Sequence, residues 1–288
     1  MNRLSTLFIC CLFFSICSLQ VRAQSCCERP KGALSASATN DMASLAANHD
    51  FKMSHEEPLP FHYDNKMGET VSFATTDGKT ASGYLLKAAK KSNKWLLVYQ
   101  EWWGLNDYVR KQADLFYADL GNVNVLAIDM YDGKVADKRE DAAKYMQAAT
   151  KERLAAIQQG VLGFVGKKAK IASVGWCFGG MLSLQSAILG GKQVVGCVMY
   201  YGRPEDNVEK LQTLQTDVLG IFGSQDGGIS PAMVATFEEN MKKANKKVTI
   251  KMYDAVHAFA NPSNPKYDKE KADDAYQNAL TYLKNKFA

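Results

Sequence analysis

The sequence has few histidines, few cysteines and no long block of charge of one sign. Its 288 residues include four histidines, seven cysteines and seven prolines, and the net charge is +5. Because this positive excess is small and dispersed, it argues against a nucleic-acid-binding protein. Seven cysteines are too sparse for a disulfide scaffold in a chain of this length. The composition, 47% hydrophobic and 23% charged, is typical of a globular protein.

Only the N-terminus carries a long apolar run. Arg3 precedes the apolar residues 4–21, and Val21-Arg22-Ala23 is typical of a cleavage site. We therefore expect residues 1–23 to be a signal peptide and the protein to be exported, either to the periplasm or by secretion. The alternatives are a retained membrane anchor and lipid attachment at Cys26. After cleavage we expect no membrane span.

The rest of the chain divides into a leader and a regular domain. Residues 24–67 are rich in Ser, Ala, Asn, His and Pro, which predicts a leader that is partly disordered or straps across the domain. Residues 68–288 predict alternating strands and helices. The expected strands are 69–75, 81–86, 95–99, 123–128, 171–174, 193–199, 218–222 and 248–253. The expected helices are 106–120, 137–164 (broken or bent near Gly160), 178–188, 231–243 and 269–286.

Alternating strands and helices indicate an α/β fold, with a mostly parallel sheet covered by helices on both faces. Ligands of such sheets bind at the carboxyl ends of the strands. The residues that follow the predicted strands are therefore the candidates for a site: Glu101, Asp129, Cys177, Tyr201, Asp226 and His257.

The segment Gly175-Trp176-Cys177-Phe178-Gly179-Gly180 follows a predicted strand and opens a predicted helix. This is the context of a nucleophile elbow, with cysteine in the place of serine. The helix N-terminus behind Cys177 favours a thiolate, and the amide of Phe178 can donate to a developing oxyanion. The alternative is a buried structural cysteine in a glycine-rich turn.

His257 is the only histidine in the regular part of the chain, and Asp226 precedes it after an earlier strand. The order Cys177, Asp226, His257 is that of the α/β-hydrolase triad. We therefore expect Cys177 to attack the substrate, His257 to transfer the proton and Asp226 to orient the imidazole. The alternatives are a solvated histidine and an Asp-Gly turn.

Four segments together resemble the dienelactone hydrolase family. They are Gln100-Glu101-Trp102-Trp103-Gly104-Leu105-Asn106, the Cys177 segment above, Gly223-Ser224-Gln225-Asp226 and His257-Ala258-Phe259-Ala260. The resemblance covers about residues 68–287. It implies a single α/β-hydrolase domain without a cap. It also implies that Glu101 contacts the cysteine and controls its ionisation, and that the amide of Trp102 is the second oxyanion donor.

One departure from the family pattern bears on the substrate. Members that act on dienelactone grip its carboxylate with two arginines, at positions that fall here at about Gly133 and at Asn261. We therefore expect a small ester or lactone other than dienelactone. We expect the aromatic side chains of Trp103, Tyr131 and Tyr201 to line the pocket, although they could simply pack the strand ends.

Two other functions compete with a cysteine hydrolase. One is a non-catalytic binding protein that retains the fold. The other is metal binding by the leader, through His49, Asp50, His55, Glu56 and His62, whose spacing matches no common zinc pattern. We expect no cofactor, no metal and no nucleic-acid partner, and we favour a monomer.

Overall fold

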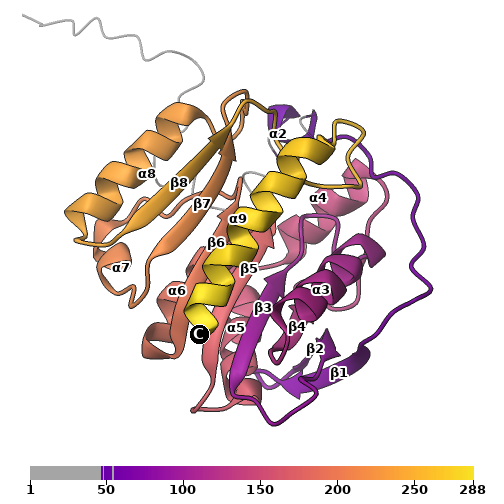
Figure 1. Ribbon diagram of the computed structural model, residues 1–288. Helices are drawn as coiled ribbons and strands as arrows, with labels where there is room; N and C mark the ends of the chain where they lie inside the picture. Colours follow the sequence, from indigo (N-terminus) through magenta and orange to yellow (C-terminus); the bar gives the residue numbers. More distant parts are fainter. Residues whose placement is uncertain (1–46, 48, 54) are drawn as a thin grey trace, which may run out of the picture. The chain divides into compact units, whose positions relative to one another are not determined.

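A central sheet of eight strands organises the part of the chain that the computed structural model describes, residues 47, 49–53 and 55–288 (Figure 1). The strand order is β1-β2-β4-β3-β5-β6-β7-β8. Strand β2 pairs antiparallel with β1 and β4, and every other pairing is parallel. The strands are β1 (Glu69–Ala74), β2 (Thr80–Leu86), β3 (Lys94–Tyr99), β4 (Asn124–Ile128), β5 (Lys170–Trp176), β6 (Val194–Tyr200), β7 (Val218–Gly223) and β8 (Val248–Tyr253).

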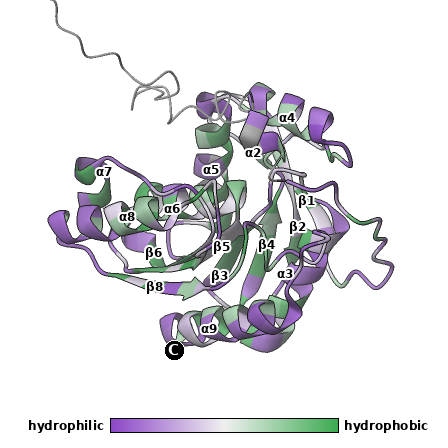
Figure 2. Cartoon of the chain, turned by 90° about the horizontal axis from the view of Figure 1, so that it is seen from above, coloured by the Kyte–Doolittle hydropathy of each residue, from purple (hydrophilic) through white to green (hydrophobic). Residues whose placement is uncertain are grey.

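Helices cover both faces of this sheet (Figure 2). Helices α3 and α9 lie on one face, and α4, α5, α6 and α8 pack on the other. The helices are α2 (His49–Met53), α3 (Asp107–Leu120), α4 (Arg139–Ala148), α5 (Lys151–Val165), α6 (Phe178–Gly190), α7 (Val208–Gln212), α8 (Pro231–Lys243) and α9 (Lys269–Phe287), with a short 3₁₀ turn at Gly191–Gln193. The predicted α/β architecture is confirmed.

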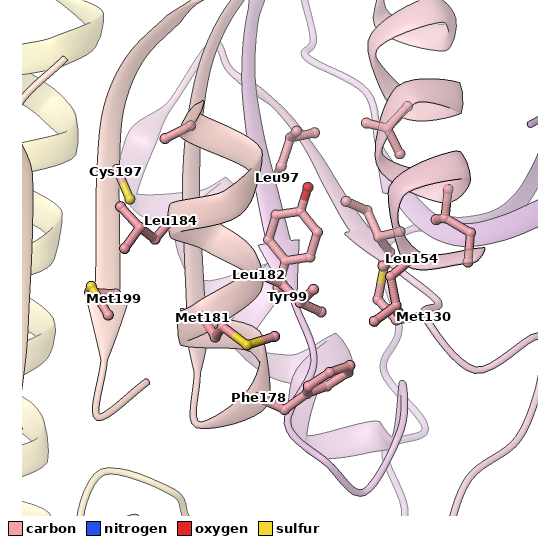
Figure 3. Packing of buried hydrophobic residues seen from close by; sticks show 14 of the residues in the cluster. Leu97, Tyr99, Met130, Leu154, Phe178, Met181, Leu182, Leu184, Cys197 and Met199 are labelled. Carbon is pink, nitrogen blue, oxygen red and sulfur yellow. The ribbon is translucent and has the colours of Figure 1, made fainter. Parts of the chain in front are cut away.

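Each face of the sheet carries its own apolar core. In the core beneath α5 and α6, Leu97 and Tyr99 of β3 meet Leu182 of α6 and Leu154 of α5 (Figure 3). Cys197 of β6 is also in this core, completely buried, with its sulfur 3.5 Å from the Ser183 hydroxyl. Cys197 is therefore a structural cysteine of the core.

The predicted helix over residues 137–164 is wrong as one element. The chain forms two helices, α4 and α5, and the break falls at Ala149 and Thr150 instead of near Gly160. The hydroxyl of Thr150 accepts a hydrogen bond from the Arg153 amide and so caps α5. Gly160 lies inside α5, where a Cβ would come within 2.6 Å of the Ala74 carbonyl oxygen. Its small size therefore serves close packing on β1 and does not end the helix.

The last part of the predicted leader lies against the regular domain. We call residues 55–67 the covering segment. Its polar contacts include Leu59 N–H to Ser263 O at 2.8 Å, Glu56 to Arg139 at 3.2 Å and to Lys266 at 3.1 Å, and the Tyr63 hydroxyl to Asp114 at 2.7 Å. Residues 1–46, which hold the predicted signal peptide and Cys26, lie outside the described residues.

None of the helices in the described residues has the length and hydropathy required to span a bilayer.

Replacing Gly179 with alanine is expected to lower the free energy of unfolding by about 3 kcal/mol or more. A Cβ at this position of α6 would overlap the carbonyl oxygens of Tyr99 and Gln100, so the helix could no longer approach β3. Gly163 is the matched control, because it is exposed in α5 and a Cβ there meets nothing within 4 Å. Gly163→Ala should stabilise the protein by about 0.5–1 kcal/mol. Chemical denaturation of both variants checks the pair, and equal effects would contradict the packing argument.

Candidate active site

Cys177 lies in the sharp turn between β5 and α6. Its backbone has φ 53° and ψ −115°, a left-handed conformation that strains a residue with a Cβ. The Cys177 amide donates to the Tyr200 carbonyl at 3.0 Å, which ties the turn to β6. Gly175 and Gly179 on either side are so close that a Cβ on Gly175 would overlap the Gly179 carbonyl. The glycines thus allow the turn that presents the thiol at the edge of the sheet.

His257 and Asp226 form a buried pair beside this turn. His257 follows β8, Asp226 follows β7, and the imidazole Nδ1 lies 2.6 Å from an Asp226 carboxylate oxygen. The other carboxylate oxygen accepts from the amides of Gly228 at 2.8 Å and Ile229 at 2.9 Å. The carboxylate is therefore fixed on one side by backbone and can orient the imidazole with the other.

Glu101 lies in the same cluster, 6% exposed, at the end of β3. Its carboxylate accepts hydrogen bonds from the Tyr201 hydroxyl at 3.3 Å and from the side-chain amide of Asn261. Burial, partly offset by the charge of His257 and by these two bonds, raises the Glu101 pKa to about 7. This carboxyl group can therefore take up or release a proton near neutral pH.

His55 of the covering segment enters this cluster, although the leader was expected only to cross the domain. Its Nε2 lies 3.1 Å from the Cys177 sulfur, and the histidine is 4% exposed. Its ring centroid is 4.3 Å from that of Trp102 and 5.0 Å from that of His257. One side-chain atom each of His55, Cys177 and His257 lies within 4.8 Å of the other two. The thiol is therefore covered by a residue 122 positions earlier in the chain.

The surroundings of Cys177 raise the pKa of its thiol above the usual value. Burial raises the pKa of Cys177, and the repulsion from Glu101 adds to this effect. The imidazole of His257 and the N–H of Phe178 act in the opposite direction but do not prevail. Burial therefore acts against the thiolate that the helix N-terminus favours.

In the pair of His257 and Asp226, the positive charge of the imidazole and the negative charge of the carboxylate stabilise each other. Burial would lower the His257 pKa, but the neighbouring Cys177 and Asp226 outweigh burial and raise this pKa well above its usual value. Burial would raise the Asp226 pKa, but the hydrogen bonds from His257, Ile229 and Gly228 lower it below the usual range. The carboxylate therefore stays ionised beside the imidazole.

The three aromatic residues predicted to line a pocket are all buried. Tyr201 is at the cluster, with its ring 5.1 Å from the His257 ring. Tyr131 stacks on Phe178 at 5.5 Å. Trp103 packs edge to face against Trp102 at 4.9 Å. Tyr201 thus borders the triad, whereas Tyr131 and Trp103 belong to the apolar core on the α5 and α6 face of the sheet.

The two positions where the family pattern has arginine have other contacts in this chain. Asn261 donates to Glu101, which the sequence had not suggested. The amide of Gly133 donates to Asp129, in the turn after β4. Sequence reasoning had marked Asn261 only as a missing arginine, and it gave no signal that His55 would reach Cys177.

Comparison with known proteins places this chain in one family. A model of the dienelactone hydrolase family matches residues 81–287. The chain is 26% identical over 230 residues to a protein of Aquifex aeolicus named "Putative carboxymethylenebutenolidase", which covers 76% of this chain and 98% of that relative. It is 28% identical over 231 residues to "Protein usf" of Aquifex pyrophilus, with the same two coverages.

Among solved structures, a dienelactone hydrolase-like promiscuous phosphotriesterase from metagenomic libraries shares the fold. The TM-score is 0.62 at 20% identity, and the match covers 76% of this chain and 98% of that one. The chain therefore belongs to the dienelactone hydrolase family, and it is a hydrolase with the α/β-hydrolase fold.

Proposed function

We propose that this protein hydrolyses small ester or lactone bonds with Cys177 as nucleophile, His257 as proton carrier and Asp226 as the group that orients His257. The observation that carries the proposal is the left-handed turn at Cys177 beside an imidazole held 2.6 Å from a carboxylate. A strained turn, a base and an orienting acid are the requirements of covalent acyl transfer.

The reaction begins when a substrate displaces His55 from the thiol. His257 takes the thiol proton, and the sulfur attacks the carbonyl carbon. The oxyanion faces the amides of Phe178 and Trp102, which stabilise its charge. When the intermediate collapses, the alcohol leaves with the proton from His257 and a thioester remains on Cys177. A water molecule, deprotonated by His257, then attacks the thioester, which releases the carboxylic acid and restores the thiol.

Glu101 acts in this scheme as a proton partner of the site. Its pKa of about 7 lets it be neutral beside the thiol and ionised beside the imidazolium that forms on attack. Asn261 and Tyr201 hold the carboxylate in place. Their hydrogen bonds favour the ionised form, whereas burial favours the neutral one.

We propose an uncharged acyl group as the substrate class. Neither Asn261 nor Gly133 offers the guanidinium fork that recognises a carboxylate in two bonds. The buried ring of Tyr201 next to His257 supplies an apolar wall instead. Dienelactone itself is therefore not the proposed substrate.

We also propose export, with residues 1–23 as the signal. The support is Arg3, the apolar residues 4–21 and the small residues before Gln24. The mature protein would then begin with the leader that ends in the covering segment.

Thiol alkylation with peptide mapping tests the chemistry. During incubation with iodoacetamide, loss of ester hydrolysis should follow the modification of Cys177, and a bound substrate should slow both. At one modified Cys177 per chain we expect about 1% or less of the initial rate, because the nucleophile is lost. Cys197, completely buried in the core, should remain unmodified. Turnover that survives full modification of Cys177 would contradict the proposal.

A further inference from the structure

Three side chains that can ligate a metal converge at the covered site: His55, Cys177 and His257. One ligand atom of each lies within 4.8 Å of the others, and all three residues are buried. A tetrahedral zinc site with these ligand types has its donor atoms about 3.3–3.6 Å apart. The 3.1 Å between His55 Nε2 and the Cys177 sulfur is close to that separation.

The second imidazole has an unused nitrogen. Among the described residues, His257 Nε2 is buried without a hydrogen-bond partner, while Nδ1 of the same ring lies 2.6 Å from an Asp226 carboxylate oxygen. When Nδ1–H donates to the carboxylate, the neutral ring carries its lone pair on Nε2, which is the form that binds a metal. A carboxylate behind a ligating histidine is also the usual support of a zinc ligand.

The charges around the cluster suit a divalent cation. A thiolate at Cys177 and the carboxylates of Asp226 and Glu101 would surround it, and both carboxylates are buried. A buried cation needs such paired charges. Thiolate and imidazole together match the softness of Zn²⁺ better than that of Mg²⁺ or Ca²⁺.

The geometry points to a Zn²⁺ site formed by His55, Cys177 and His257 in the covered state of the protein. Three protein ligands leave one position of the tetrahedron open, as in zinc sites that exchange a ligand. Because the metal would occupy the proposed nucleophile and the proposed base together, its binding excludes acyl transfer. The metal would thereby hold the covering segment on the site. The exclusion of acyl transfer rests on the proposed function, whereas the binding of the metal does not.

The test measures binding of Zn²⁺ and Co²⁺ to the purified, metal-free protein. We expect one equivalent of metal per chain in a competition with a chromophoric chelator, and a sulfur-to-cobalt charge-transfer band with Co²⁺. His55→Ala, Cys177→Ala and His257→Ala should each weaken binding by at least about 100-fold, and Asp226→Asn by about 10–100-fold. The circular dichroism of each variant shows whether it is folded. His55→Gln also removes the imidazole, as His55→Ala does, but leaves a larger side chain in its place.

Matched controls separate this site from the other possible ligands of the chain. His62, in the same segment but pairing with Asp64 and Asp107 at the surface, should be replaceable by alanine without effect on binding. Cys197→Ser should likewise keep the charge-transfer band. No bound metal in the wild type, or affinity unchanged by both His55→Ala and Cys177→Ala, would overturn the inference. Metal-free protein that binds Zn²⁺ but turns over no ester would overturn the proposed function and support the site.

Discussion

Replacing Cys177 with alanine is expected to lower kcat/KM for ester hydrolysis by about 10⁴-fold or more. No other cysteine of the described residues faces an imidazole, since Cys197 is enclosed between β6 and α6. Without the sulfur, His257 and the backbone amides can only assist the direct attack of water. The measurement is a panel of neutral aryl esters and lactones, run on the wild type and Cys177→Ala in parallel.

Cys197→Ala is the control for this experiment. It removes a buried thiol of the same size from the core under α6 (Figure 3) and should lower stability while leaving kcat/KM within about twofold. Full activity in Cys177→Ala would show that another group attacks the substrate. A wild type that turns over no compound, but whose ligand binding survives Cys177→Ala, would favour a non-catalytic binding protein.

The strand–helix alternation was predictable because each element carries a local signal. Alternating or continuous apolar runs marked all eight strands, and the predicted helix starts at residues 106 and 231 agree with those of α3 and α8 within a residue. The break between α4 and α5 was missed because Gly160 gave the stronger signal. Its role is a close approach to Ala74, which only the tertiary contact reveals.

The same distinction between local signals and tertiary contacts applies to the residues of the site. Cys177, Asp226, His257 and Glu101 all follow strands of one sheet, so the topology alone brings them to one edge. His55 and Asn261 have no such constraint. His55 reaches the cluster through a segment without regular structure, held by contacts such as that of Glu56 with Arg139. Contacts of this kind, between positions far apart in the sequence, leave no periodic pattern to read.

The position of His55 makes the covering segment an obstacle to substrate as well as a source of a ligand. Cys177 is only 4% exposed, and the pocket beside Glu101 is lined by residues that include neither Cys177 nor His257. An ester must therefore displace the imidazole of His55 before the sulfur can reach a carbonyl carbon. The apparent affinity for substrate is then reduced by the fraction of molecules in which the site is open.

His55→Ala is accordingly expected to raise kcat/KM for small neutral esters by about 10-fold or more in metal-free buffer. The substitution removes the contacts of the imidazole with the thiol and with Trp102, while the ion pairs of Glu56 keep the covering segment on the domain. The rise should therefore come mainly from KM, because opening the site precedes the chemical step. His62→Ala, which alters a surface contact of the same segment, should leave both constants unchanged.

A fall in kcat for His55→Ala would contradict this expectation, since it would mean that this imidazole takes part in proton transfer. Chelator-treated protein separates the two effects of His55, which are blocking the substrate and binding Zn²⁺. If residual Zn²⁺ alone slowed the wild type, chelator treatment would remove the difference in kcat/KM between the wild type and His55→Ala. If kcat/KM rises in the variant and the treated wild type remains slower, the covering side chain itself limits access. In that case the covering segment regulates the hydrolase even when no metal is bound, and Zn²⁺ strengthens a closure that this segment already makes.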